Sequence, residues 1–189
     1  MANAVAEKLD VDGFLAAFEG REGRWELRSG LPVKLSAETA GHVRVKGLAY
    51  RALQDAITRA RAPCEAFPEG LTVRIDRMNA YEPDALVQCG APVADRSLEA
   101  PTPIIVVEVI SPSSRAFDRG TKRDGYFSLP SVQHYLILDP EQQTVAHHFR
   151  KPYGGLDSRD LRSSPLRLDP PGLDLDVAAL FTPSPSAPR

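Results

Sequence analysis

The pattern of apolar and polar residues divides the chain into short strands and a few helices. Its strongest feature is residues 104–110, Ile-Ile-Val-Val-Glu-Val-Ile, where β-branched residues surround a single charge. Such a run predicts a central strand that is buried on both faces. Pro32 indicates that the strand around it is an edge strand or starts irregularly. The further strands predicted from β-prone runs are 25–28, 31–35, 71–75, 81–87, 133–138 and 144–149, with turns at Ser29-Gly30 and Asp139-Pro140-Glu141.

Helical spacing of apolar residues predicts three helices. The longest starts at Ser36, a favourable N-cap, and runs to about Arg59. A short amphipathic helix is expected at 10–19, and another at 118–129. The long helix carries one apolar stripe, formed by Val45, Leu48, Ala49, Ala52, Leu53, Ala56 and Ile57.

The remaining segments are expected to be loop or docking segments. Residues 150–171 are rich in Gly, Pro, Ser and charge, which predicts a loop with one short strand at 166–168. Residues 173–181 supply a last apolar segment, and the Pro/Ser-rich residues 182–189 are expected to form a flexible tail. The whole is predicted to be one α/β (α+β) domain spanning residues 1–181.

Composition narrows the classes of function. With 189 residues, 42% hydrophobic and 25% charged, the chain resembles an ordinary globular protein. No apolar run approaches the roughly 20 residues that span a bilayer, and no signal-peptide pattern is present, so a cytoplasmic location is expected. The net charge of −2 disfavours a protein that coats DNA non-specifically. Basic side chains still cluster at Arg44, Lys46, Arg51, Arg59 and Arg61 and at Arg115, Arg119, Lys122 and Arg123, either as a binding patch or as solvated helix faces.

Cysteine and histidine positions suggest no metal centre of their own. Cys64 and Cys89 lack Cys-x-x-Cys spacing and are predicted to be packing residues, with no disulfide framework and no thiolate zinc site. His147 and His148 are adjacent, so in a strand they point to opposite faces and are expected to be structural. His42, near the start of the long helix, either approaches a site or packs.

A glutamate inside the most hydrophobic strand is the oddest feature of the sequence. Burying an unpaired carboxylate costs several kcal/mol, so Glu108 needs a partner. Asp84 lies in the predicted strand 81–87 and converges with Glu108 if the two strands are neighbours. Either a shared proton or a divalent cation such as Mg²⁺ or Mn²⁺, which prefers oxygen ligands, would relieve their repulsion.

Lys122 lies 14 residues beyond Glu108, on the predicted following helix, and could fold back over the carboxylates. There it would stabilise charge developing on a phosphate, while a metal activates water. This combination favours hydrolysis of phosphodiesters. The alternatives are that Glu108 simply forms an ion pair with Lys122, that Asp84 is a turn residue after a proline, and that Tyr126 belongs to the core.

One block of residues resembles a known family. Pro83-Asp84, then Glu108-Val109-Ile110-Ser111-Pro112-Ser113-Ser114, then Asp118, Lys122 and Tyr126, and finally the strand His134-Tyr135-Leu136-Ile137-Leu138-Asp139 resemble the Uma-two-type family of bacterial restriction endonucleases. This family belongs to the PD-(D/E)XK restriction-endonuclease-like superfamily. Fainter similarity extends upstream through Glu26-Leu27-Arg28-Ser29-Gly30 and His42, so the resemblance covers roughly residues 25–149.

The resemblance implies a restriction-endonuclease-like core, a mixed sheet of four or five strands flanked by helices. It implies catalytic Asp84, Glu108 and Lys122, with Mg²⁺ or Mn²⁺ bound by Asp84, Glu108 and Val109. The motif lysine is expected two residues after Glu108, where this chain has Ile110, so Lys122 would replace it from the helix. Glu26 corresponds to an upstream acidic position that could add a metal ligand.

The main hypothesis is therefore a Mg²⁺-dependent endodeoxyribonuclease. Its expected partner is nucleic acid, DNA in the first instance, with a homodimer left open and no membrane contact. The missing strand lysine and the acidic net charge motivate an alternative, a catalytically inactive nucleic-acid- or protein-binding protein on the same fold. A third hypothesis is a hydrolase of smaller phosphoesters with a closed pocket. Ser111 to Ser114 lacks a Gly-x-Ser-x-Gly elbow and is predicted to be a turn, not a nucleophile, and no nucleotide-binding fingerprint is present.

Overall fold

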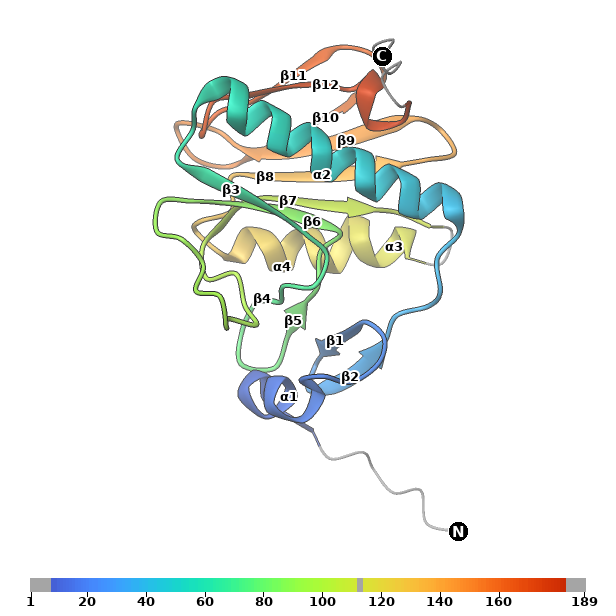
Figure 1. The fold of residues 1–189 in the computed structure, drawn as a ribbon, viewed down its shortest axis with the longest axis vertical. Helices are drawn as coiled ribbons and strands as arrows, with labels where there is room; N and C mark the ends of the chain where they lie inside the picture. Colours follow the sequence, from blue (N-terminus) through green and yellow to red (C-terminus); the bar gives the residue numbers. More distant parts are fainter. Residues whose placement is uncertain (1–7, 112–113, 183–189) are drawn as a thin grey trace.

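A six-stranded mixed sheet forms the centre of the computed structural model, which describes residues 8–111 and 114–182. The strand order is β10-β9-β8-β7-β6-β3, with β7 and β8 parallel and the other pairs antiparallel. Helix α2 crosses one face of the sheet, and α3 and α4 cover the other (Figure 1). The strands are β3 (Cys64–Pro68), β6 (Ala85–Cys89), β7 (Pro103–Val109), β8 (His134–Asp139), β9 (Thr144–Arg150) and β10 (Leu156–Leu161).

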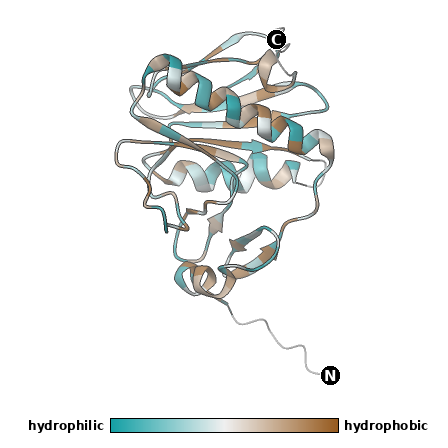
Figure 2. Ribbon diagram, viewed as in Figure 1, coloured by the Kyte–Doolittle hydropathy of each residue, from teal (hydrophilic) through white to brown (hydrophobic). Residues whose placement is uncertain are grey.

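Strand β7 is the buried central strand that the sequence predicts. It lies between β6 and β8, and its alternate side chains enter two separate cores. Ile105, Val107 and Val109 pack under α2, whereas Val106 packs on the side of α4. Glu108 follows Val106 in this alternation, so the sheet geometry places its carboxylate in an apolar layer. The brown, hydrophobic colour of this strand lies between the two helical layers in Figure 2.

The sheet has one strand more than the four or five expected. Residues 156–161 form β10, which pairs with β9 although most of its side chains are exposed. An edge strand that faces solvent carries no apolar alternation, which explains why composition predicted a loop here. The predicted turn at Asp139-Pro140-Glu141 does connect β8 and β9.

Helix α2 (Ala40–Ala60) starts four residues later than predicted. Thr39, not Ser36, is the N-cap, since its side chain accepts a hydrogen bond from the His42 amide. The predicted helix at 118–129 is also different, because it is composite. Short α3 (Arg115–Phe117) runs into a π-helical turn, η1 (Asp118–Lys122), and then into α4 (Arg123–Ser128).

A smaller four-stranded sheet, ordered β2-β1-β5-β4, packs against α1 and lies beside the main sheet (Figure 1). The predicted hairpin is confirmed, and β2 is an edge strand as Pro32 indicates. The predicted strand at 81–87 is broken into β5 and β6, because Pro83 between them has no amide to donate. The elements are α1 (Val11–Phe18), β1 (Trp25–Arg28), β2 (Leu31–Lys34), β4 (Val73–Arg74) and β5 (Ala80–Tyr81).

The C-terminal segment docks on α2 as an ordered hairpin. Strands β11 (Pro165–Leu168) and β12 (Leu173–Asp176) pair with each other, and a 3-10 turn, η2 (Ala178–Leu180), follows. Their buried side chains join the core under α2. This confirms the predicted apolar docking of 173–181 and extends the predicted strand at 166–168. The predicted tail falls almost entirely on residues 183–189, which lie outside the described residues.

The prediction that the two cysteines only pack is wrong, because Cys64 and Cys89 form a disulfide. The antiparallel register of β3 and β6 places them directly opposite each other. Spacing along the chain carries no information about that register, so the sequence pattern gave no signal for the bond. Among the described residues, the structure contains no helix with the length and apolar character needed to cross a membrane.

Candidate active site

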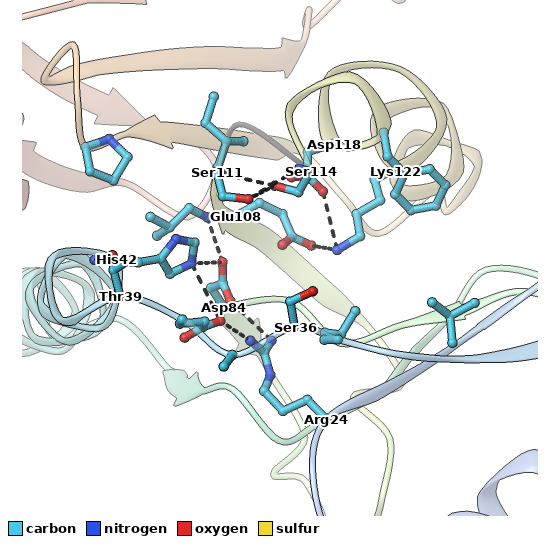
Figure 3. Close-up of a pocket in the computed structure, with 18 of the residues that line it drawn as sticks. Arg24, Ser36, Thr39, His42, Asp84, Glu108, Ser111, Ser114, Asp118 and Lys122 are labelled. Atoms are coloured by element: carbon cyan, nitrogen blue, oxygen red, sulfur yellow. Dashed lines mark hydrogen bonds and ion pairs between the residues drawn. The ribbon is translucent and has the colours of Figure 1, made fainter.

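A cleft of about 550 Å³ opens where the carboxyl end of β7 meets the first turn of α2. The β1–β2 hairpin, the segment before α2 and the start of α3 complete its walls. Asp84, Glu108, Val109 and Lys122 all line this cleft. The structure therefore brings together the four residues that the sequence analysis selected. Figure 3 shows Asp84, Glu108 and Lys122 in one close-up, with His42 and Arg24 on one side and Lys122 on the other.

Asp84 and Glu108 are neighbours because of strand register. Ala85 pairs with Val107 in the antiparallel β6–β7 ladder, which places Asp84 opposite Glu108 at its end. The Asp84 amide donates to the Val107 carbonyl at 3.0 Å, and the Val109 amide donates to Asp84 Oδ2 at 2.7 Å.

Asp84 is held in its ionised form by neighbouring cations. Its side chain is 5% exposed, and Oδ1 accepts contacts from Arg24 at 3.2 Å and Lys46 at 3.1 Å. Burial would raise the pKa of Asp84, but His42, Lys46, Arg24 and the Val109 amide together outweigh burial and hold the pKa well below its usual range. Asp84 is thus a permanent anion at neutral pH.

Glu108 is in the opposite situation. Its side chain is 5% exposed, and its Oε1 accepts hydrogen bonds from Lys122 Nζ and Tyr126 Oη, both at 2.8 Å. Burial raises the pKa of Glu108 well above its usual value, and repulsion from Asp84 and Asp118 adds to the increase against the attraction of Lys122. The two hydrogen-bond donors therefore do not offset the cost of ionising this buried carboxyl group.

Lys122 extends from η1 into the carboxylates, as the sequence predicts. Its Nζ lies 2.7 Å from Glu26 Oε1, 2.8 Å from Glu108 Oε1 and 3.6 Å from Asp118 Oδ1. Burial lowers the pKa of Lys122, but the attraction of Glu108, Glu26 and Asp118 outweighs burial and raises the pKa above its ordinary value. Lys122 stays protonated at neutral pH, which excludes it as a base.

Further polar residues surround this group, and the sequence analysis selected only two of them. Glu26 is fully buried and contacts Lys122, and His42 lies 3.8 Å from Asp84 Oδ2. The analysis missed the partners that approach from distant segments. A usable signal existed for Glu38, which is four residues before His42 at the start of a helix. The missed residues are Arg24, Glu38, Glu69 and Glu82, together with the site roles of Lys46 and of Asp118, which was named only within the family block.

The ion pairs of the cleft contain more acidic than basic groups. Among the described residues, ion pairs and one hydrogen bond connect a group that contains seven carboxylates, four cationic side chains and His42. The acidic members are Glu26, Glu38, Glu69, Glu82, Asp84, Glu108 and Asp118, and the cationic members are Arg24, Arg28, Lys46 and Lys122. Four of these carboxylates are buried, those of Glu26, Asp84, Glu108 and Asp118, and carboxylate oxygens are the ligands that hard divalent cations prefer. The residues present therefore fit a divalent metal ion.

The other candidate residues lie elsewhere or play structural parts. His147 is buried and contacts His134, whereas His148 stacks on Tyr135, so the two do point apart as predicted. The Ser114 amide donates to the Ser111 carbonyl and hydroxyl, which fits the predicted turn, although Pro112 and Ser113 lie outside the described residues. Tyr126 is a core residue that also touches the site.

The proteins and families that this chain is similar to include a family model, a curated relative and a solved structure. The family model Uma2, described as "Putative restriction endonuclease", matches residues 11–178. An uncharacterized protein of Synechocystis sp., slr1290, is 39% identical over 77 residues, which is 40% of this chain and 40% of that protein. The chain thus matches about two fifths of this relative's length.

A solved structure matches far more of the chain. The crystal structure of a putative nuclease belonging to DUF820 from Anabaena variabilis superposes with a TM-score of 0.71 at 18% identity. The match covers 92% of this chain and 97% of that chain. At this identity the likeness concerns the fold, and it confirms the predicted restriction-endonuclease-like core.

Proposed function

Because the chain belongs to the Uma2 family, we propose that it is a metal-dependent endonuclease that hydrolyses nucleic-acid phosphodiesters in the cleft. The observation that carries the proposal is the meeting of Asp84 and Glu108 at the ends of paired strands, with Lys122 beside them. Asp84, Glu108 and the Val109 carbonyl would hold Mg²⁺ or Mn²⁺. When bound, such an ion polarises a phosphate and activates a water molecule.

Lys122 would act as a fixed cation. Its ammonium group has three protons; Glu108 Oε1 accepts one of them at 2.8 Å, and Glu26 Oε1 is an ion-pair partner at 2.7 Å. A further proton would be available for a non-bridging oxygen of the scissile phosphate, because Asp118 lies farther away at 3.6 Å. In a buried site, such a fixed positive charge stabilises the charge that develops during phosphoryl transfer.

DNA is the proposed substrate, since a duplex or single strand can reach a site that is open to solvent. Lys34 on β2, an exposed basic side chain that lines the cleft, could contact a backbone phosphate. The first test is a cleavage assay on supercoiled, linear and single-stranded DNA and on RNA, with Mg²⁺, Mn²⁺ or EDTA. We expect metal-dependent cleavage of DNA by the wild type and a fall of at least about 10²-fold in Asp84→Asn and Glu108→Gln.

Matched controls are Asp55→Asn and Glu65→Gln, which remove exposed carboxylates outside the cleft and should leave cleavage unchanged. Cleavage that survives in both site variants would reject the assignment. Absence of cleavage in every metal and substrate would favour the second candidate, a binding protein on the same fold. The observation behind that candidate is the extent of ion pairing, since Arg24, Lys46 and Lys122 already contact the carboxylates.

A further inference from the structure

Three metal-ligand side chains meet beside Asp84 in an arrangement that the sequence motif does not include. Glu38 and His42 are four residues apart, and Asp84 comes from the segment between β5 and β6. One ligand atom from each of the three lies within 4.8 Å of the others. Glu108 and Val109 are not part of this group, so it differs from the position proposed above.

Local structure fixes the direction of His42. Thr39 caps α2 and accepts the His42 amide, so His42 sits in the first helical turn. Its ring then lies on the same side as Glu38, as i and i+4 positions do at a helix start. The imidazole is 13% exposed and lines the cleft, which leaves it accessible to an ion from solvent.

The separations fit a shared ion better than direct contact. His42 Nε2 lies 3.6 Å from Glu38 Oε1 and 3.8 Å from Asp84 Oδ2, beyond the length of an ordinary hydrogen bond. Two ligand atoms that each bind one ion at about 2.1 Å can be up to about 4.2 Å apart. An ion between these atoms therefore needs little movement of the side chains.

The arginine and lysine that contact Asp84 approach one of its two carboxylate oxygens, and His42 lies near the other. Arg24 and Lys46 contact Oδ1, whereas Oδ2 faces the Val109 amide and His42. Glu38 would bind the ion in addition to Arg24 and Lys46, which it already contacts. The surplus of carboxylates over cations in the cleft favours a second positive ion at this point.

An imidazole ligand also selects the kind of ion. Mg²⁺ takes oxygen ligands and keeps much of its water, whereas first-row transition ions accept imidazole nitrogen readily. We propose that Glu38, His42 and Asp84 form a second metal position, adjacent to the first and sharing Asp84, which takes a transition-metal ion such as Mn²⁺ in preference to Mg²⁺. This inference rests on the proposed nuclease function, because the second metal position and the proposed catalytic metal position both use Asp84.

The test is electron spin echo spectroscopy of the Mn²⁺-loaded protein, which detects ¹⁴N bound to the ion. We expect ¹⁴N modulation in the wild type, its loss in His42→Gln, and its retention in His148→Gln, a histidine on β9 outside the cleft. Calorimetry should show at least about tenfold weaker Mn²⁺ binding in His42→Gln, with Mg²⁺ affinity maintained. Wild-type protein with ¹⁵N-labelled histidine should also lose the ¹⁴N signal, which keeps the test decisive if the variant does not fold.

The inference fails if Mn²⁺ binds without ¹⁴N modulation, if modulation persists in His42→Gln, or if no Mn²⁺ binds. Cleavage in Mg²⁺ separates this failure from failure of the proposed function. If Mg²⁺-dependent cleavage still requires Asp84 and Glu108, the nuclease assignment stands and only the second metal position is rejected. If neither metal binding nor cleavage occurs, both are rejected.

Discussion

Tyr126 shows how a core residue can act on the site through a neighbour. Its hydroxyl donates to Glu108 Oε1 at 2.8 Å, and the side chain is fully buried. Tyr126→Phe should remove one of two donors from Glu108 and destabilise the carboxylate. We expect a loss of about 1 kcal/mol in the free energy of unfolding and weaker divalent-metal binding.

The matched control is Tyr135→Phe. The hydroxyl of Tyr135 donates to the Asp118 backbone carbonyl and not to Glu108. Tyr135→Phe should lower the free energy of unfolding by a similar amount, but its affinity for divalent metal should stay closer to that of the wild type. Chemical unfolding and calorimetry measure the two quantities separately. Equal metal affinity in Tyr126→Phe and the wild type would contradict a positioning role for Tyr126.

Lys46 illustrates how the site remains folded without metal. Its ammonium group contacts Glu38, Glu69 and Asp84, and the side chain is 6% exposed. Lys46→Met should leave these carboxylates repelling one another and lower the free energy of unfolding in EDTA by about 3 kcal/mol. A saturating divalent ion should restore part of that loss, because it binds the folded state alone.

Thermal unfolding with EDTA and with Mn²⁺ measures this linkage. Lys34→Met, which removes an exposed lysine at the rim of the cleft, is the control and should behave as the wild type does in both conditions. If Mn²⁺ stabilises Lys46→Met no more than the wild type, Lys46 does not substitute for a metal ion.

At the scale of elements, strands β8 and β9 are tied to the C-terminal hairpin by a chain of histidines. Arg159 Nε donates to His147 Nδ1, so His147 Nε2 carries the proton that His134 Nδ1 accepts at 2.9 Å. His134 Nε2 then donates to the Pro170 carbonyl at 2.8 Å. This arrangement requires both rings to be neutral.

Burial lowers the pKa of His134 to about 4 and that of His147 to about 3, from 6.5. Below pH 6.5 the unfolded chain therefore binds protons that the folded protein does not, and stability falls as the pH approaches 4. Replacing both histidines by Phe should flatten this part of the stability curve. Urea unfolding between pH 7 and pH 4 measures it, and an unchanged slope in the double variant would contradict the neutral pair.

Strong local patterns predict elements well, and long-range contacts explain the errors. The continuous apolar run of β7 and the apolar stripe of α2 are distinct enough for both elements to be recognised in the sequence. The π turn η1 is not, because no local pattern encodes the contacts of Lys122, at its end, with Glu26 and Glu108 from distant strands. Turns of this type are rare and often mark functional sites.

The same limit applies to the site. Glu108 could be selected because its charge stands out in an apolar strand, and Asp84 and Lys122 because a neighbouring strand and the following helix could bring them to it, as the family resemblance also implies. Arg24 could not, since it is 60 residues from Asp84 and looks like any surface arginine in the sequence. The roles of the selected residues stay predictions that the geometry supports.

At the scale of the whole molecule, the fold divides stability and chemistry between different regions. The two cores on either face of the main sheet hold the strands, and the charged cleft lies where β7 ends. The smaller sheet contributes Glu26, so the cleft is complete only when both sheets are in place. The surplus of carboxylates there is the property on which the account depends.

Calorimetric titration of the metal-free protein with Mg²⁺ and Mn²⁺ tests whether the carboxylates of the cleft bind a divalent ion. We expect the wild type to bind both ions, Asp84→Asn and Glu108→Gln to lose at least about tenfold in affinity, and Asp55→Asn to match the wild type. Binding that is unchanged in Asp84→Asn and Glu108→Gln, or no binding by the wild type, would contradict the metal site and leave the carboxylates as structural ion pairs.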